Sequence, residues 1–191
     1  MSENKKDTIE SILNKFEITA LNPMQERASK AIQSKSDVVL LSPTGTGKTL
    51  AFLLPLIERL DRECEEIQLL ILVPSRELAQ QIEQVARNMG SGFKVNAVYG
   101  GRSGSEDKID LRHRPAILIG TPGRVADRIR RDKFPLEYIN TLILDEFDKS
   151  LEIGFEKEMT EIIDALPNVK QRILFFIYFY FYNFPLCYIK L

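Results

Sequence analysis

A glycine-rich stretch, PTGTGKT, occupies residues 43–49. It follows an apolar run and precedes an amphipathic one, which predicts a loop between a strand and a helix. Glycine lets the backbone wrap a phosphate with its N–H groups, and the start of the helix offers further N–H groups and its dipole to the same anion. Lys48 can reach the β- and γ-phosphates, and the Thr49 hydroxyl can bind Mg²⁺. A plain turn needs no Lys-Thr pair, so we predict a nucleotide site formed by Thr44, Gly45, Thr46, Gly47, Lys48 and Thr49.

Two adjacent carboxylates, Asp145 and Glu146, come directly after the apolar run INTLIL. At the tip of a buried strand beside a phosphate-binding loop, Asp145 can hold Mg²⁺ directly or through water. Glu146 can then orient or deprotonate an attacking water molecule. Taken alone, the pair is equally compatible with two acids that cap the next helix. The phosphate-binding loop earlier in the chain favours the metal interpretation.

Short runs rich in Val, Ile and Leu alternate with amphipathic stretches along the chain. Nearly continuous apolar runs of this length are typical of parallel strands buried on both faces. We therefore predict a three-layer α/β domain with a mainly parallel sheet flanked by helices, and ligands at the carboxyl ends of its strands. The predicted strands are 37–42, 68–73, 94–99, 115–120 and 139–145, and the predicted helices lie near 23–34, 48–60, 75–89, 123–131 and 155–165.

Length and composition fit one ordinary globular domain. A chain of 191 residues can bury a sizeable core without disulfide staples. Cys64 and Cys187 have neither metal-binding nor disulfide spacing, so we expect no disulfide partner and a reducing compartment, the cytoplasm or the nucleus. His113 is the single histidine and makes no metal site by itself. The N-terminal residues have no apolar core, so we expect no secretory signal.

The net charge of −1 hides a segregation of charges along the chain. Residues 102–133 hold nine Lys and Arg against five Asp and Glu, whereas residues 137–164 hold two against nine. One interpretation is a pair of solvated helical faces of opposite sign. The other is a basic strip for a polyanion beside an acidic metal site. Charge counting alone favours the first.

Several motifs together resemble those of the DEAD-box RNA helicases of superfamily 2. The resemblance covers residues from about 12 to 174, which correspond to the first of that family's two RecA-like domains. Ser42 takes the position that the family gives to a small residue before its Thr-Gly-x-Gly-Lys-Thr loop. The other motifs follow in the family's order: NPMQ (22–25), PSRELAQQ (74–81), Gly100-Gly101, TPGR (121–124) and DEFD (145–148).

The resemblance implies an enzyme that uses ATP and Mg²⁺ to unwind or remodel RNA, which it binds independently of sequence. Gln25 would read the edge of adenine, and Asp148 would couple the domains. Groups at helix starts grip phosphates rather than base edges, which agrees with backbone binding. The implied catalytic residues are Lys48, Asp145 and Glu146, the metal ligands Thr49 and Asp145, and the RNA-binding residues Arg76, Gly101, Thr121 and Arg124.

The same resemblance divides the chain into three parts: an N-terminal segment with the glutamine motif at 1–36, a RecA-like ATP-binding domain at 37–176 that stops before the family's domain end, and an atypical aromatic tail at 177–191. The family's second RecA-like domain, with its arginine fingers, is missing from this sequence. We therefore expect little activity from the chain alone. Two alternatives stay open: a non-catalytic fragment that binds nucleotide or RNA, and another P-loop ATPase that depends on nucleic acid, such as a DNA translocase.

Two departures from the family pattern stand near the predicted site. Phe147 replaces Ala but leaves the three acids of DEFD in place, so we expect the chemistry to survive. The run QRILFF at 171–176 resembles the strand that ends in the family's Ser-Ala-Thr motif, yet the tail at 177–191 follows instead. Asn183 and Pro185 interrupt that tail too early for a membrane span, and we expect no membrane partner. We expect the tail to derive from a frameshift, an intron or a misread gene boundary.

Overall fold

The computed structural model describes residues 10–43, 45–101, 114–132 and 135–176. The predictions for Thr44, His113 and Cys187, and for the aromatic tail at 177–191, lie outside the described residues. Part of the N-terminal segment and part of the basic stretch 102–133 also lie outside them.

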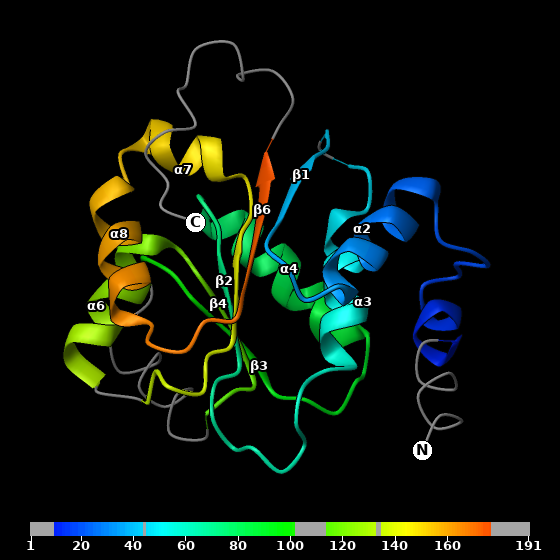
Figure 1. Ribbon diagram of the computed structural model, residues 1–191, viewed down its shortest axis with the longest axis horizontal. Coiled ribbons are helices and arrows are strands. Elements are labelled where there is room, and N and C mark those ends of the chain that lie inside the picture. The colour runs from blue at the N-terminus through cyan, green and yellow to red at the C-terminus, as the bar shows by residue number, and fades with distance from the viewer. Residues whose placement is uncertain (1–9, 44, 102–113, 133–134, 177–191) are drawn as a thin grey trace.

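A sheet of six strands, all parallel, forms the middle layer (Figure 1). All five strands predicted from apolar runs are present, and the run QRILFF adds the sixth. The order across the sheet is β1-β6-β5-β2-β4-β3, so that β1 and β3 are its edges. The strands are β1 (Val38–Leu41), β2 (Leu69–Leu72), β3 (Val95–Val98), β4 (Ile117–Gly120), β5 (Thr141–Leu144) and β6 (Gln171–Phe176).

Helices cover both faces of the sheet, which confirms the predicted three-layer architecture (Figure 1). Local sequence signals start two of them: Asn22 and Gln25 form a reciprocal capping box, and the Ser75 side chain accepts a hydrogen bond from Leu78 N. One face carries α2 (Pro23–Gln33), α3 (Lys48–Ile57) and α4 (Arg76–Asn88), and the other carries α6 (Pro122–Asp132), α7 (Phe147–Ile153) and α8 (Glu156–Ala165).

The core consists of two apolar clusters, one on each side of the sheet. Because successive side chains of a strand point to opposite faces, neighbouring residues of β6 enter different clusters. Phe175 packs on Phe52 of α3, with ring centroids 5.3 Å apart. Phe176 packs on Phe147 of α7, with ring centroids 5.4 Å apart and planes at 80°. The strand β6 thus joins the helix after the phosphate-binding loop to the helix that begins inside DEFD.

The helix α7 was not among the predicted helices, and the structure corrects that prediction. It starts directly after Glu146, inside the motif DEFD, and ends at Ile153, before the C-cap Gly154, whose φ of 95° is left-handed. Its seven residues make fewer than two turns. So short a segment gives no clear helical periodicity, and only the C-terminal glycine signals it.

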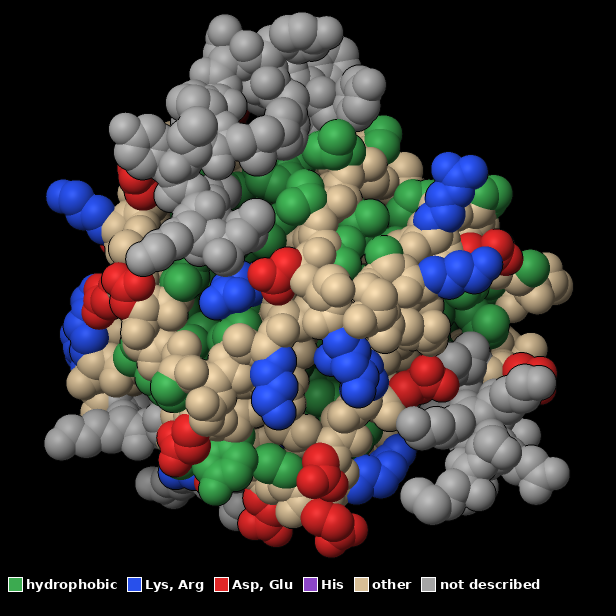
Figure 2. Space-filling view, in the orientation of Figure 1, with side chains coloured by type: hydrophobic (Ala, Val, Ile, Leu, Met, Phe, Trp, Pro, Cys, Tyr) green, Lys and Arg blue, Asp and Glu red, His purple; other side chains and the backbone are tan. Residues whose placement is uncertain are grey.

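Charges of both signs are interspersed on the face of the molecule shown in Figure 2. Ion pairs also join the two segments of opposite charge, because Arg130 of the basic stretch binds Glu161 of the acidic one. Both observations favour solvated helical faces over one continuous basic strip on this side. Among the described residues, no helix has the length and apolar character needed to cross a membrane.

Candidate nucleotide and nucleic-acid site

The order of the strands sorts the predicted site residues into two neighbouring groups at one edge of the sheet. The phosphate-binding loop follows β1 and Asp145 follows β5, and these two strands flank β6. Arg76 follows β2, Gly101 follows β3 and Thr121 follows β4, and these three strands are adjacent on the other side of β5. All strands are parallel, so every one of these residues lies at the carboxyl edge.

The phosphate-binding loop is held by short-range polar contacts. Gly45 and Gly47 have φ angles of 78° and 81°, a left-handed conformation that side chains rarely adopt, and Gly47 is the N-cap of α3. The Thr46 hydroxyl lies 2.6 Å from the Ser42 hydroxyl and donates to Pro43 O at 3.0 Å. A hydroxyl at position 42 therefore adds a bond across the loop, which an alanine there would remove.

Lys48 lies inside this loop. Its side chain is 8% exposed, and Nζ donates to Ser42 O at 3.2 Å. Thr49, the next residue of α3, is half-buried. The ammonium group is thus surrounded by the backbone that is predicted to cradle phosphate. To reach a phosphate oxygen, Nζ has to exchange its bond to Ser42 O for one to the anion.

Gln25 connects α2 to the same loop. Its amide oxygen accepts a hydrogen bond from Asn22 N at 2.9 Å, and its amide nitrogen donates to Gly47 O at 3.2 Å. A Cβ atom on Gly47 would lie 2.4 Å from that nitrogen, so a larger residue there would displace the Gln25 amide. Asn22 Nδ2 donates to Thr46 O at 3.2 Å. A primary amide keeps one N–H and one lone pair beyond these bonds, which are the groups that pair with adenine N7 and N6.

Asp145 is a buried carboxyl group at the end of β5, with 3% of its surface exposed. Burial, which disfavours the charged form, raises the pKa of Asp145 to about 6, and Lys48 opposes part of this rise. The carboxylate accepts a hydrogen bond from Glu146 N at 3.0 Å. A buried acid that faces a buried cation is typical of a functional site rather than of a stabilising surface pair.

Glu146 has a left-handed backbone, with φ 49° and ψ 48°. Such a conformation costs a non-glycine residue of the order of 1 kcal/mol and clusters at active sites. Its side chain makes no cap bond to α7, which argues against the interpretation of the two acids as helix caps. Instead, Lys149 Nζ binds Glu146 Oε2 at 3.0 Å. Sequence reasoning missed this lysine, because the helix α7, which places Lys149 one turn after Glu146, was not predicted.

The aromatic rings of Phe147 and Phe176 pack on each other near the candidate nucleotide site. The backbone oxygen of Phe176 accepts a hydrogen bond from Ser42 N at 3.1 Å, so the end of β6 adjoins the phosphate-binding loop. Phe147 adjoins Glu146 and Asp148 in the chain, and both rings are at most 9% exposed. Asp148 Oδ1 is buried and has no hydrogen-bond partner within the described residues. The departure at Phe147 therefore contacts the last residue of the run QRILFF.

We expect substitutions at Phe147 and Phe176 to be energetically coupled. Edge-to-face aromatic pairs contribute about 0.5–1.5 kcal/mol beyond the area that they bury. A double-mutant cycle of Phe147→Leu and Phe176→Leu, measured by urea unfolding, should show a coupling free energy in that range. The cycle of Phe147→Leu with Phe52→Leu is the control, because Phe52 belongs to the cluster on the other face. Coupling no larger than in the control would show that the two rings do not stabilise each other.

The second group of site residues contains Gly101 and Arg76, which lie next to each other. Arg76 is the first residue of α4, is half-exposed and pairs with Glu77 at 3.3 Å. A Cβ atom on Gly101 would lie 3.3 Å from the Arg76 guanidinium, and Gly101 has a φ of 92°. The glycine therefore brings bare backbone against this arginine. Together they offer N–H groups and a cation to a phosphate.

Thr121 and Arg124 lie at the start of α6. Thr121 N donates to Val98 O at 3.2 Å, and Thr121 O accepts from Arg124 N at 3.0 Å, so the loop after β4 is fixed to β3. The Arg124 guanidinium binds Asp127 at 3.1 Å. The structure thus places all four predicted RNA-binding residues along the ends of β2, β4 and β3.

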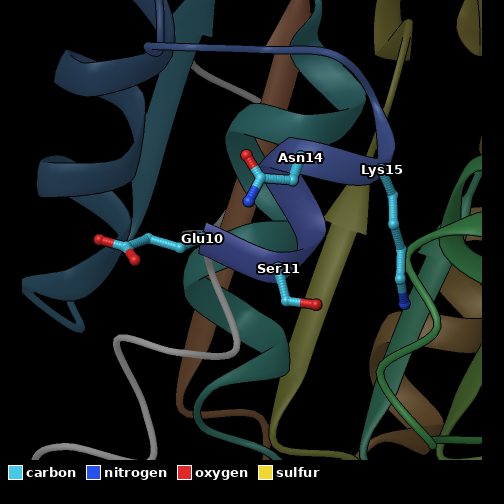
Figure 3. A pocket seen from close by; sticks show the side chains of 4 residues that line it. All are labelled: Glu10, Ser11, Asn14 and Lys15. Atoms are coloured by element: carbon cyan, nitrogen blue, oxygen red, sulfur yellow. The ribbon is translucent and has the colours of Figure 1, made fainter.

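A shallow hollow of about 530 Å³ lies elsewhere, beside the helical segment at residues 10–15 (Figure 3). Glu10, Ser11, Asn14 and Lys15 line it. Lys15 Nζ donates to Met89 O, at the end of α4 opposite to Arg76. The hollow shares no residue with the candidate site and adjoins the amino edge of the sheet.

Comparison with known proteins agrees with this geometry. The sequence profile described as DEAD/DEAH box helicase matches residues 22–176. The chain is 41% identical over 155 residues to the ATP-dependent RNA helicase CshA of Limosilactobacillus reuteri, and the match covers 80% of this chain and 31% of that protein. It is 38% identical over 155 residues to the probable ATP-dependent RNA helicase YfmL of Bacillus subtilis, which covers 80% of this chain and 41% of that protein.

Among solved structures, the fold is similar to that of a hypothetical ATP-dependent RNA helicase from Sulfolobus tokodaii. The TM-score is 0.81 at 27% identity, and the match covers 89% of this chain and 50% of that one. The chain therefore spans half or less of the length of the relatives named here.

Proposed function

We propose that this chain, which belongs to the DEAD/DEAH box helicase family, is the first RecA-like domain of an ATP-dependent RNA helicase and binds ATP, Mg²⁺ and RNA. The observation that supports this most is the strand order β1-β6-β5-β2-β4-β3. It puts the residues suited to a nucleotide and those suited to an RNA backbone side by side on one edge. A second domain that closes over that edge would enclose both ATP and RNA.

In this proposal, the loop at 43–49 and the start of α3 bind the phosphates of ATP. Lys48 leaves Ser42 O and stabilises negative charge on the β- and γ-phosphates. Glu146 orients the attacking water, because its left-handed backbone turns the side chain away from a capping role. Lys149, bonded to Glu146, holds that carboxylate until the water is in place.

The residues at the end of β5 and the start of α3 fit Mg²⁺. This ion is usually held by one or two carboxylates together with phosphates and waters rather than by a full protein cage. Asp145 and the Thr49 hydroxyl offer such a partial set, and no group of three or more acidic, histidine or cysteine ligands occurs among the described residues. When bound, the ion would supply positive charge that offsets the negative charge of the phosphates. Asp145 would orient it.

RNA would bind through Arg76, Gly101, Thr121 and Arg124, which present backbone N–H groups and guanidinium groups rather than a surface for base edges. Binding should therefore be independent of sequence. The whole helicase would need a second RecA-like domain to supply an arginine finger. Without one, we propose that the 191-residue chain turns over ATP slowly.

The nucleotide half of the proposal predicts a preference for adenine. Replacing Gln25 by Ala should weaken ADP binding by about 5- to 100-fold, since a bidentate amide–adenine pair contributes about 1–3 kcal/mol. GDP affinity should change little. Titration of fluorescent ADP and GDP into both proteins measures this, with Gln33→Ala at the exposed far end of α2 as the control. Equal affinity of the unchanged protein for ADP and GDP would contradict the role of Gln25.

A further inference from the structure

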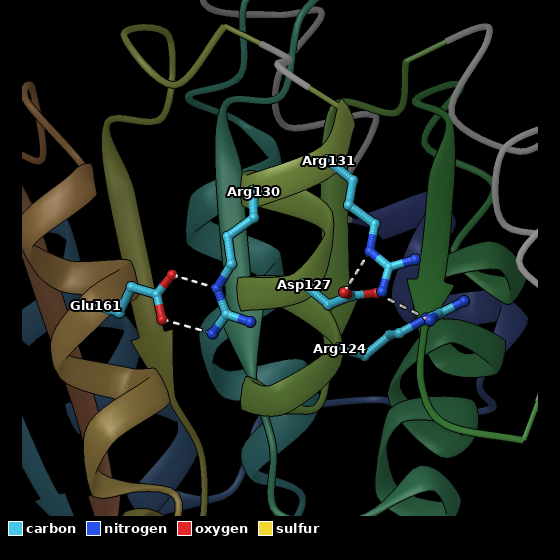
Figure 4. A network of polar contacts seen from close by, with 5 residues as sticks. All are labelled: Arg124, Asp127, Arg130, Arg131 and Glu161. Carbon is cyan, nitrogen blue, oxygen red and sulfur yellow. Dashed lines mark hydrogen bonds and ion pairs between the residues drawn. The ribbon is translucent and has the colours of Figure 1, made fainter.

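Two arginines of α6 share one carboxylate. Asp127 Oδ2 binds Arg124 Nη1 at 3.1 Å, and Asp127 Oδ1 binds Arg131 Nε at 2.6 Å. The three residues are spaced three and four apart, so they lie on one face of the helix. Figure 4 shows the Arg131 side chain running back along α6 toward the N-terminal turn that carries Arg124. The two guanidinium groups meet on either side of Asp127.

The neighbouring Arg130 behaves differently. Both of its nitrogens Nε and Nη2 bind Glu161 of α8 at 2.6 Å, on the other side of α6 (Figure 4). The hydrogen bond from Arg130 lowers the pKa of Glu161, so this pair is a matched cation and anion. On the Asp127 side, one carboxylate faces two guanidinium groups. Asp127 therefore holds the Arg131 guanidinium next to that of Arg124, a predicted phosphate contact.

We propose that Arg131 is a further RNA phosphate contact beside Arg124, and that Asp127 is a positioning residue that holds both guanidinium groups in place. The inference rests on the proposed function, because it extends the RNA-binding edge along α6. The Arg131 side chain is 70% exposed, and its bond to Asp127 uses one of the five N–H donors of a guanidinium. The planar donor pair that remains suits the two oxygens of a phosphate.

Replacing Asp127 distinguishes a positioning role from a purely electrostatic one, because the two roles predict opposite changes in RNA affinity. Replacing Asp127 by Asn removes a negative charge from a surface that would bind a polyanion. If charge alone mattered, RNA would bind more tightly. If the carboxylate holds the two arginines in a binding geometry, its loss frees two long side chains, and RNA binds more weakly despite the added positive charge.

The experiment measures binding of a fluorescent single-stranded oligouridine to the purified chain by anisotropy over a series of salt concentrations. Arg131→Gln should weaken binding by about 2- to 5-fold, the range of an exposed ion pair. It should also reduce the slope of log K against log salt by about 0.7, the value for one contact to single-stranded phosphate. Arg130→Gln, in which an equally charged neighbour is lost, should change both quantities much less. Asp127→Asn should weaken binding.

The outcomes separate this inference from the proposed function. The inference is overturned if Arg131→Gln weakens RNA binding no more than Arg130→Gln does. It is also overturned if Asp127→Asn binds RNA more tightly than the unchanged chain. If Arg76→Gln and Arg124→Gln weaken RNA binding in the same experiment, the proposed function stands even when the inference about Arg131 fails. If the unchanged chain binds no RNA, or prefers an acidic peptide, both fail. The ADP affinity of Arg130→Gln should stay constant, because Arg130 binds Glu161 of α8.

Discussion

Replacing Glu146 by Gln should abolish the ATP turnover that this chain shows when a second RecA-like domain is supplied in trans. The chain alone should hydrolyse ATP near the background rate, since we propose that the arginine finger, which contributes about 10³-fold or more, comes from the second domain. A complementing domain from a relative should raise the rate in the presence of RNA. Loss of the carboxylate that orients water should then lower it by about 10²–10⁴-fold.

The control for this result is Glu152→Gln, which makes the same change on an exposed residue of α7, the helix that follows Glu146. It should leave turnover intact. ADP affinity should be similar in the unchanged protein and in Glu146→Gln, because the substitution acts on the water rather than on the phosphates. RNA-stimulated turnover by the chain alone would refute the need for a second domain. Equal stimulation by DNA and RNA would favour another nucleic-acid-dependent P-loop ATPase.

The strands β2 to β5 could be predicted from sequence because each is buried on both faces. Runs such as QLLILV leave almost no polar position, and nearly every residue of β2 to β5 is buried in the structure. The helix starts at Asn22 and Ser75 could also be predicted, since capping is local. The helix α7 could not, because it depends on the left-handed backbone of Glu146, which no neighbouring residue signals.

The sequence predicted that the site residues lie at strand ends. It did not predict which of these ends are neighbours. The order of the strands is a long-range property, and the sequence did not indicate that β6 lies between β1 and β5. The contact between Phe147 and Phe176, 29 positions apart in the chain, follows from that order. The bond between the Ser42 and Thr46 hydroxyls and the sharing of Asp127 by two arginines were also missed, because they depend on side-chain directions rather than on residue types.

Asp145→Asn should stabilise the nucleotide-free protein at pH 7.5 while removing most of its response to Mg²⁺. Burial raises the pKa of Asp145 from 3.8 to about 6, so the folded state binds this proton more tightly than the unfolded state does. Above pH 6, the ionised carboxylate therefore lowers the free energy of unfolding by up to about 3 kcal/mol, at about 1.4 kcal/mol for each pKa unit. As the pH falls from 6 toward 3.8, the folded state gains this energy back through protonation.

Asparagine keeps the shape of the side chain without the charge, so it should raise the urea midpoint at pH 7.5, and the gain should fade below about pH 4. Asp164→Asn, on an exposed position of α8, should have little effect at either pH. Mg²⁺ with ADP should stabilise the unchanged protein more than the Asp145 variant, because the variant lacks the carboxylate that would orient the ion. Urea unfolding at several pH values, with and without Mg²⁺ and ADP, measures both effects. A variant that is less stable at pH 7.5 would show that attraction to Lys48 outweighs the cost of burial, and that this acid stabilises the domain even without its ligand.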